Sequence, residues 1–284
     1  MNDTAQRQKD FAQFAAARGR PALFLILQQP LDADHLLLVR AALADRHFPE
    51  LDLVVHCHGG SIHTAYQIVA LLRLHCSTLI AVVPLRAKSA GTLLAIGADR
   101  IVMDEIAELG PLDTQIYEER PGGKGEFTSA LNPFKALEQL QTYSLETLDL
   151  AMRLIVRRSG LDLDTSLRAA IEFVRATTGP LLAQLEAEKL GEYSRALSIG
   201  EEYGKRLLRR SGEWDEEKVS TLIQRLVHDY PTHEYVIDYA EALDLGLPVE
   251  LFASHERAAV LNLYPHLASP DDLIELVQPP SGGR

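Results

Sequence analysis

The sequence is poor in cysteine and in basic side chains. Its 284 residues include only two cysteines, Cys57 and Cys76, which are too few for a disulfide framework. Both lie among apolar residues, where a reduced thiol packs as a small hydrophobe. Lys and Arg number 28 against 40 Asp and Glu, so the net charge is −12. Phosphate contacts need clustered Lys and Arg, and the charge therefore argues against nucleic acid as a partner.

Long apolar runs and cofactor motifs are also missing. No stretch approaches the roughly 18 consecutive apolar residues of a membrane span, and the polar segment 1–17 lacks the apolar run of a signal peptide. We therefore expect a soluble, cytoplasmic protein without a membrane span. The dinucleotide fingerprint Gly-x-Gly-x-x-Gly is absent, and the histidines around Cys57 do not have the spacing of zinc ligands. The sequence predicts no cofactor and no metal.

Short β-rich runs alternate with helical patterns in the first hundred residues. Strands are predicted over 22–28, 51–57, 78–84 and 100–103, and helices over 32–47, 61–75 and from Ser89 to near Gly97. This β-α-β-α-β order is typical of an α/β fold with a largely parallel sheet.

The pattern becomes helical after residue 113. Residues 117–129 are predicted to form an exposed loop. Asn132 is expected to cap a long helix, and further helices are predicted over 164–176, 180–190, 192–210 and 214–228. An extended run over 235–237 and a helix capped by Asp238 then resemble the first half again.

This return to the α/β pattern predicts four parts. They are an N-terminal helical extension over 1–20, an α/β core over 21–116 and 230–268, a helical insertion over 117–229 and a flexible tail over 269–284. The insertion is expected to act as a lid or as an oligomer contact.

Two turns carry the candidate chemistry. Gly59-Gly60 follows one predicted strand and Ser89 follows the next, so both turns should meet at the carboxyl edge of the sheet. Small neighbours expose the Ser89 hydroxyl near uncommitted N–H groups, as an acyl-transfer nucleophile requires, and glycine lets an N–H approach a ligand closely. Each turn also has a plain structural interpretation: Gly-Gly as a tight turn, and Ser89 as a helix cap.

The two turns, together with the segments 98–103 and 109–113, resemble the Clp-protease/crotonase superfamily. The resemblance is closest to the serine dehydrogenase proteinase family, related to signal peptide peptidase A, and includes the segments 202–208 and 230–238. It implies a core of repeated β-β-α and β-α-β units and a serine peptidase activity. By this resemblance Ser89 is the nucleophile, and Gly59, Gly60 and the N–H of Ala90 form the oxyanion hole.

The proton acceptor is less well defined by the resemblance. The Clp proteolytic subunit carries a histidine a couple of dozen residues after its serine, but this chain has no histidine between His75 and His228. Relatives of signal peptide peptidase A use a downstream lysine instead, for which the candidates are Lys124, Lys135 and Lys205.

Lys135 is the first expectation for this role. It follows a helix start, where the helix dipole disfavours a cation, and partial burial would also favour its neutral form. His233 is the second candidate, either as the base or to orient Lys135, because it falls near the position of the triad acid in the Clp subunit. Lys88 adjoins the nucleophile and is expected to point away from it.

The sequence thus predicts an ATP-independent serine peptidase. Its substrates would be peptides or unfolded segments, and the resemblance implies assembly with further copies of the chain as a ring or a dimer of trimers. Two alternatives are a crotonase-type enzyme for acyl thioesters and an inactive oligomeric scaffold of the same fold.

Overall fold

The structure is a computed structural model that describes residues 2–119, 125–210 and 214–280. It divides the chain into two compact units, Met1–Asp113 with Ile199–Arg284, and Thr114–Ser198. Residues 199–229 therefore belong to the unit that contains the α/β core, and not to the insertion predicted over 117–229. One reason is that the Leu112 N–H donates to the Leu226 carbonyl at 2.7 Å.

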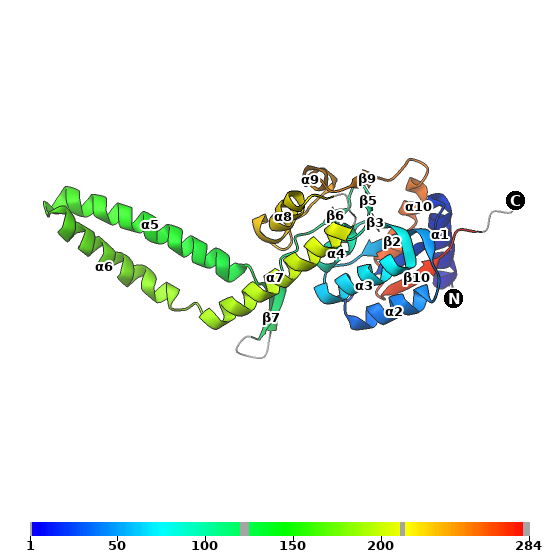
Figure 1. Ribbon diagram of the computed structural model, residues 1–284, viewed down its shortest axis with the longest axis horizontal. Coiled ribbons are helices and arrows are strands. Elements are labelled where there is room, and N and C mark those ends of the chain that lie inside the picture. The colour runs from blue at the N-terminus through cyan, green and yellow to red at the C-terminus, as the bar shows by residue number, and fades with distance from the viewer. Residues whose placement is uncertain (1, 120–124, 211–213, 281–284) are drawn as a thin grey trace. The chain divides into compact units, whose positions relative to one another are not determined.

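The first unit is built on a six-stranded sheet (Figure 1). The strand order is β10 (Leu273–Val277), β1 (Ala22–Ile26), β2 (Phe48–His56), β3 (Cys76–Val83), β5 (Arg100–Met103) and β9 (Val249–Leu251). All neighbouring strands are parallel except β10, which is antiparallel to β1. The predicted α/β fold and largely parallel sheet are confirmed.

Strand β10 corrects the prediction of a flexible tail over 269–284. The apolar segment Leu273–Val277 pairs along the whole open edge of β1, from Leu273 opposite Ile26 to Val277 opposite Ala22. The Pro- and Gly-rich end of the chain suggested fraying, but the five residues before it satisfy the backbone groups of an otherwise unpaired edge. Residues 281–284 lie outside the described residues.

Three helices follow the parallel strands in the first half of the chain. They are α2 (Ala33–Leu43), α3 (Ile62–His75) and α4 (Ala90–Ile96). The side chains of Asp32 and Ser61 accept N–H groups at the starts of α2 and α3, which confirms the predicted start of each helix. Apolar side chains of α3 and its neighbours are buried against the strands.

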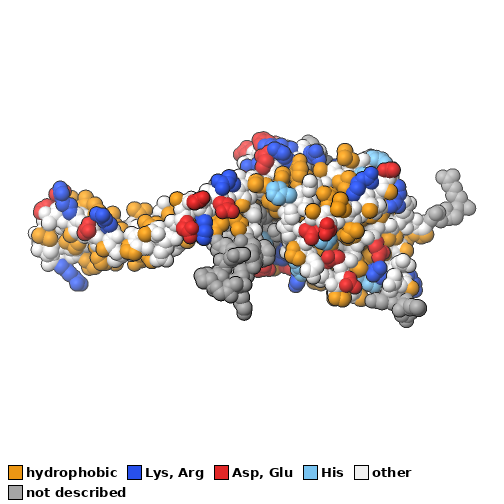
Figure 2. Space-filling model, turned by 90° about the horizontal axis from the view of Figure 1, so that it is seen from below, with side chains coloured by type: hydrophobic (Ala, Val, Ile, Leu, Met, Phe, Trp, Pro, Cys, Tyr) orange, Lys and Arg blue, Asp and Glu red, His pale blue; other side chains and the backbone are white. Residues whose placement is uncertain are grey.

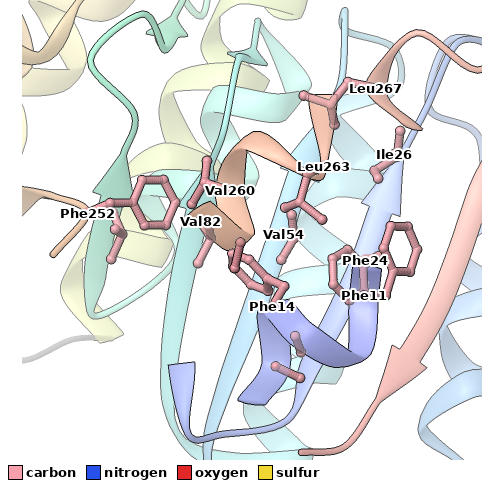
Figure 3. Packing of buried hydrophobic residues seen from close by; sticks show 14 of the residues in the cluster. Phe11, Phe14, Phe24, Ile26, Val54, Val82, Phe252, Val260, Leu263 and Leu267 are labelled. Atoms are coloured by element: carbon pink, nitrogen blue, oxygen red, sulfur yellow. The ribbon is translucent and has the colours of Figure 1, made fainter. Parts of the chain in front are cut away.

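The other face of the sheet is covered by α1 (Asn2–Arg18), α10 (Arg257–Leu261) and α11 (Tyr264–Leu267) (Figure 3). Phe11 of α1 stacks on Phe24 of β1 with a centroid distance of 3.8 Å. Arg18 is buried and bridges Asp52 at 2.6 Å and Glu256 at 2.7 Å. The predicted N-terminal extension is therefore an integral layer of this unit.

The second unit contains a β-hairpin and long helices. Strands β7 (Gln115–Glu119) and β8 (Gly125–Ser129) pair antiparallel, which corrects the loop predicted over 117–129, although 120–124 lie outside the described residues. Helices α5 (Asn132–Ser159) and α6 (Leu163–Leu182) pack side by side, and α7 (Ala187–Arg210) begins in this unit.

Two helix boundaries in this unit differ from the sequence prediction. Asn132 is the first residue of α5 and not its cap, because its side chain donates to the Thr128 hydroxyl at 3.1 Å. Pro180 lies inside α6 and does not begin a new helix. The helix continues for two residues beyond it, although the proline ring removes the N–H that would donate to the Ala176 carbonyl.

The remaining elements return the chain to the sheet. They are α8 (Glu216–Gln224), a π-helical turn over Arg225–Asp229 and α9 (Tyr239–Asp244), which is capped by Asp238 as predicted. Two short strands, β4 (Arg86–Ala87) and β6 (Glu108–Leu109), pair beside the end of the sheet. Among the described residues, no helix combines the length and apolar composition needed to cross a membrane.

Candidate active site

Ser89 occupies a strained turn between β4 and α4. Its φ is +51° and its ψ is −110°, an uncommon conformation for a residue with a side chain. Ser89 stands at the N-cap position of α4, yet its side chain makes no capping hydrogen bond. The hydroxyl is therefore not used to start the helix, although the backbone is held in a conformation that costs about 1–2 kcal/mol.

The Gly59-Gly60 turn closely approaches two other backbone segments. A Cβ on Gly60 would lie 2.2 Å from the Leu31 nitrogen, and one on Gly59 would lie 3.5 Å from the Ser89 Cβ and 3.9 Å from its Oγ. Both glycines have φ near +130°. The turn therefore needs glycine for its conformation and, at Gly60, also for space. The Ser89 side chain faces this turn, as the sequence predicted for a shared edge.

Cys57 forms hydrogen bonds with both turns. Its N–H donates to the Arg86 carbonyl and its carbonyl accepts from the Lys88 N–H, both at 2.9 Å. The Gly59 N–H donates to the Cys57 Sγ at 3.4 Å, so this amide points to the thiol. Burial raises the pKa of the Cys57 thiol to about 11, which keeps it protonated and unreactive near neutral pH.

Two backbone amides remain available at this edge. Within the part of the chain that the structure describes, the N–H groups of Gly60 and Ala90 donate no hydrogen bond. Of the three donors predicted for the oxyanion hole, Gly59 is thus already engaged by Cys57, whereas Gly60 and Ala90 are open. The sequence pattern could not separate the two glycines, because the thiol contact depends on how the turn folds back on its own strand.

His233 pairs with a buried carboxylate. Its Nδ1 lies 2.7 Å from the Asp113 Oδ1, and the two side chains are 12% and 6% exposed. The loop that carries His233 is held at several points. Ile237 and Leu109 exchange two backbone hydrogen bonds at 3.1 and 2.9 Å, and the Leu112 N–H is fixed by the π-helical turn.

Lys88 also holds this loop. Its ammonium donates to the Tyr235 carbonyl at 3.0 Å and pairs with Glu108 at 3.2 Å. The side chain is only 8% exposed, and it runs past Gly110, where a Cβ would lie 2.7 Å from the Lys88 Cδ. The side chain next to Ser89 therefore has structural partners in the Tyr235 carbonyl and Glu108.

A polar cavity of about 350 Å³ opens beside these residues. Its lining combines groups from the turn before Gly59, from strand β4 and the residue after it, from strand β6, and from the loop of His233. These residues are His58, Arg86, Lys88, Glu108, His233, Glu234 and Val236. The neighbours of both candidate turns thus share one cavity with His233.

Lys135 does not have the burial that was expected for a base. Its side chain is 53% exposed, and its ammonium lies 3.7 Å from Glu138 on the next turn of α5. Lys205 is paired with Glu201 at 3.3 Å. Lys124 lies outside the described residues. Of the three lysines predicted as the base, the two that the structure describes are therefore not buried.

His56 is the last residue of β2 and directly precedes Cys57. It is 3% exposed, and its Nδ1 is buried without a hydrogen-bond partner among the described residues. Its ring contacts that of His58 edge to face, with centroids 5.2 Å apart. Burial, and then the charges of His58 and Arg86, lower the pKa of His56 to about 4. His56 is therefore a neutral core residue.

Sequence reasoning did not select Asp113, Glu108 or Arg86 as site residues. The position of Asp113 in the sequence could have indicated a role in the site. This residue ends the segment 109–113 and stands a couple of dozen residues after Ser89, where the Clp subunit carries its histidine. The expected residue type at that position was histidine, so the aspartate was not considered a partner for His233.

Comparison with known proteins agrees with the sequence resemblance. Residues 29–124 match the sequence model of the family described as ClpP-like SDH-type serine proteinase. This segment includes Gly59, Gly60, Ser89 and Asp113. Over residues 29–124 the match confirms the resemblance to the serine dehydrogenase proteinase family, and it agrees with the Clp-like fold.

Two relatives are uncharacterized proteins of Methanocaldococcus jannaschii. MJ0137 is 30% identical over 82% of this chain and 64% of its own length, and MJ1495 is 25% identical over 76% of this chain and 57% of its own length. The chain thus spans less than two thirds of each of these relatives.

Replacing Gly60 with alanine is expected to destabilise the protein far more than Gly246→Ala. Both positions have positive φ, so each alanine is strained by about 1 kcal/mol or more. Only the Cβ at position 60 collides with backbone, at 2.2 Å from Leu31, since nothing lies within 4 Å of one at position 246. Urea unfolding of the two variants measures the difference. Equal losses would show that Leu31 does not confine the turn.

The free energy of unfolding is expected to decrease from about pH 7 to about pH 5, partly because of His56. The pKa of His56 is lowered from 6.5 to about 4, so between these values the unfolded chain binds a proton that the folded chain does not. This stability is present above pH 6.5 and is lost as the pH falls, by about 2 kcal/mol at pH 5. Urea unfolding at both pH values should show a smaller decrease for His56→Phe. An equal decrease in the two proteins would contradict the assignment.

Proposed function

We propose that this chain is a serine peptidase in which the Ser89 hydroxyl attacks a peptide carbonyl. The family match of residues 29–124 to the ClpP-like serine proteinases supports this proposal. The observation that carries the proposal is the conformation of Ser89, with φ +51° and no capping hydrogen bond. A serine that served only as a helix cap would use its hydroxyl on the first turn of α4. A strained serine at a strand-to-helix turn is instead typical of nucleophiles.

The oxyanion of the tetrahedral intermediate would be bound by the N–H groups of Gly60 and Ala90. Two facts support this assignment. Both amides are open within the described residues, and the Gly60 turn faces the Ser89 side chain across Gly59. Preorganised amides of this kind stabilise the developing negative charge without reorganising during the reaction. Gly59 would shape the turn and leave the donation to Gly60.

His233 is the base that the contacts favour over Lys135. Asp113 accepts the Nδ1 proton, so Nε2 is the nitrogen that would take the proton of Ser89 and later deliver it to the leaving amine. Imidazole needs no large change in pKa to do this near neutral pH. Lys135 keeps the role of second candidate, although its side chain is 53% exposed and pairs with Glu138.

The positions of His233 and Asp113 add support. In the Clp subunit, the histidine follows the serine by a couple of dozen residues and the acid comes later in the chain. Here an aspartate stands at the first position and a histidine near the second. The pair at 2.7 Å would thus supply the same two groups with their places in the sequence exchanged.

The proposed substrates are peptides or unfolded segments cleaved without ATP. A polar cavity of about 350 Å³ beside the candidate turns is large enough for one peptide side chain, which supports this part of the proposal. A crotonase-type reaction would need a free carboxylate base. Of the two glutamates that line the cavity, Glu108 already pairs through its two oxygens with Arg86 at 3.0 Å and Lys88 at 3.2 Å, so the carboxylate base of such a reaction would have to be Glu234.

A fluorophosphonate probe is expected to label the wild type and to leave Ser89→Ala unlabelled. His233→Ala should slow labelling by about 10²-fold or more, and Asp113→Asn by a smaller factor, because a serine is a poor nucleophile without an oriented base. Lys135→Ala should label at the wild-type rate. Labelling is followed by gel fluorescence and intact mass, after circular dichroism has shown that each variant is folded.

The same experiment decides between the bases and tests the activity itself. A large loss of labelling in Lys135→Ala, with none in His233→Ala, would transfer the role of base to Lys135. Failure of the folded wild type to label would contradict the serine-hydrolase proposal and favour an inactive scaffold.

We also propose that further copies of this chain cover the hairpin of α5 and α6. Helix α5 buries none of its 28 residues. Figure 2 shows hydrophobic side chains over the visible face of this hairpin, and large apolar side chains remain exposed along both helices. They are Tyr143, Leu145, Leu150, Leu154, Val156, Leu163, Leu167, Ile171, Phe173, Leu181 and Leu182. Monomers rarely expose so many, and the ring or dimer of trimers implied by the resemblance would bury them.

Light scattering coupled to size exclusion should therefore give a mass of several chains. The double variant Leu145→Asp with Phe173→Asp should shift that mass toward a single chain, because two carboxylates in an apolar interface are costly to bury. Leu243→Asp, at a 53% exposed position on α9, serves as the matched control and should keep the mass. A monomeric wild type would contradict this assignment of the hairpin.

A further inference from the structure

The surface between α2 and α3 carries an apolar groove that the candidate site does not use. It has a volume of about 710 Å³ and is open to solvent along one side. Leu36 and Leu37 of α2 form one wall. Leu37 is 67% exposed, and Leu74 on the α3 wall is 76% exposed.

Helix α3 has two apolar stripes instead of one. The first stripe, Ala65, Ile68, Val69 and Leu72, is buried in the unit. The second, Ala70, Leu71 and Leu74, lines the groove at helical spacing. A surface helix normally has one apolar face, and a helix that is apolar on further sides is normally covered there too. The second stripe is therefore the mark of an interaction surface.

Charge indicates what covers this stripe. Arg40, Arg73 and Arg210 line the groove, and no described acidic side chain does so. Arg73 is neutralised by a close carboxylate and Arg40 forms only an exposed ion pair, so Arg40 and Arg210 are the charges that favour an anionic occupant. Arg73 is held by Asp99 at 2.6 Å and Arg40 reaches Asp45 at 3.3 Å. The buried Nε of Arg73 has no acceptor among the described residues.

The shape of the groove distinguishes a helix from a small ligand. Pockets for small molecules enclose most of the ligand surface, whereas this groove is open along its side. A groove between two helices is the shape into which the ridge of a third helix packs. We propose that the groove binds an amphipathic helix of another protein, with its apolar face on Leu37 and Leu74 and acidic side chains beside Arg40 and Arg210.

A fluorescein-labelled peptide of about 18 residues tests this proposal, with Leu on one helical face and Glu on its flanks. Fluorescence anisotropy with the full chain should show saturable binding. Leu74→Asp should weaken it by about tenfold or more, since an apolar contact is lost and a like charge is added. Arg40→Glu should weaken it several-fold and reduce its dependence on salt. Leu261→Asp, at a 62% exposed position on α10, should bind as the wild type does.

Three further probes complete the test. A scrambled Leu/Glu peptide and a Leu/Lys peptide should bind weakly, and sodium dodecanoate should not displace the Leu/Glu peptide. Equal binding to wild type, Leu74→Asp and Arg40→Glu would overturn the proposal. Displacement by dodecanoate would assign the groove to a fatty acid, and a change of mass in Leu74→Asp by light scattering would assign it to a second copy. Since none of these variants alters Ser89, its labelling should be unchanged whether or not the helix binds.

Discussion

The close approach of Gly60 to the backbone of Leu31 is the constraint on which the candidate site depends. A side chain at this position would overlap Leu31, so the chain can leave β2 and enter α3 by this route only through glycine. The Leu31 N–H donates to the Gly59 carbonyl and the Leu31 carbonyl accepts from Ser61, which fixes the turn from both sides. The parallel pairing of β1, β2 and β3 then brings this turn to the same edge as Ser89.

Cys57 and Lys88 are buried residues that link the Gly59-Gly60 turn, the Ser89 turn and the loop of His233. The backbone of Cys57 binds both segments that flank Ser89, and its thiol takes the amide of Gly59. Lys88 extends from the turn of Ser89 to the carbonyl of Tyr235 in the loop of His233. A chain of short contacts therefore joins the two candidate turns to the candidate base. A buried ammonium is stable here because a carboxylate and a carbonyl replace its water.

Several elements were predictable from local signals. The strand over 100–103, the Asp32 and Asp238 caps and the helix after Ser61 follow from periodicity and capping residues that act within a few positions. The edge strand β10 and the hairpin of β7 and β8 were missed, because a short strand is stabilised by a partner that local sequence does not specify. The local sequence predicts a helix boundary at Pro180, but α6 continues through it to Leu182.

The sequence by itself determined the order of the main strands and helices over 22–103, the two turns with Gly59-Gly60 and Ser89, and the family to which residues 29–124 are matched. These depend on residue types at short spacing. Only the tertiary structure decided that the Gly59 amide is taken by Cys57, that His233 pairs with Asp113, and that Lys135 is exposed. His233 and Asp113 are hydrogen-bonded although they lie 120 residues apart in the sequence. Burial and hydrogen-bond partners across such separations arise from packing, which no local pattern encodes.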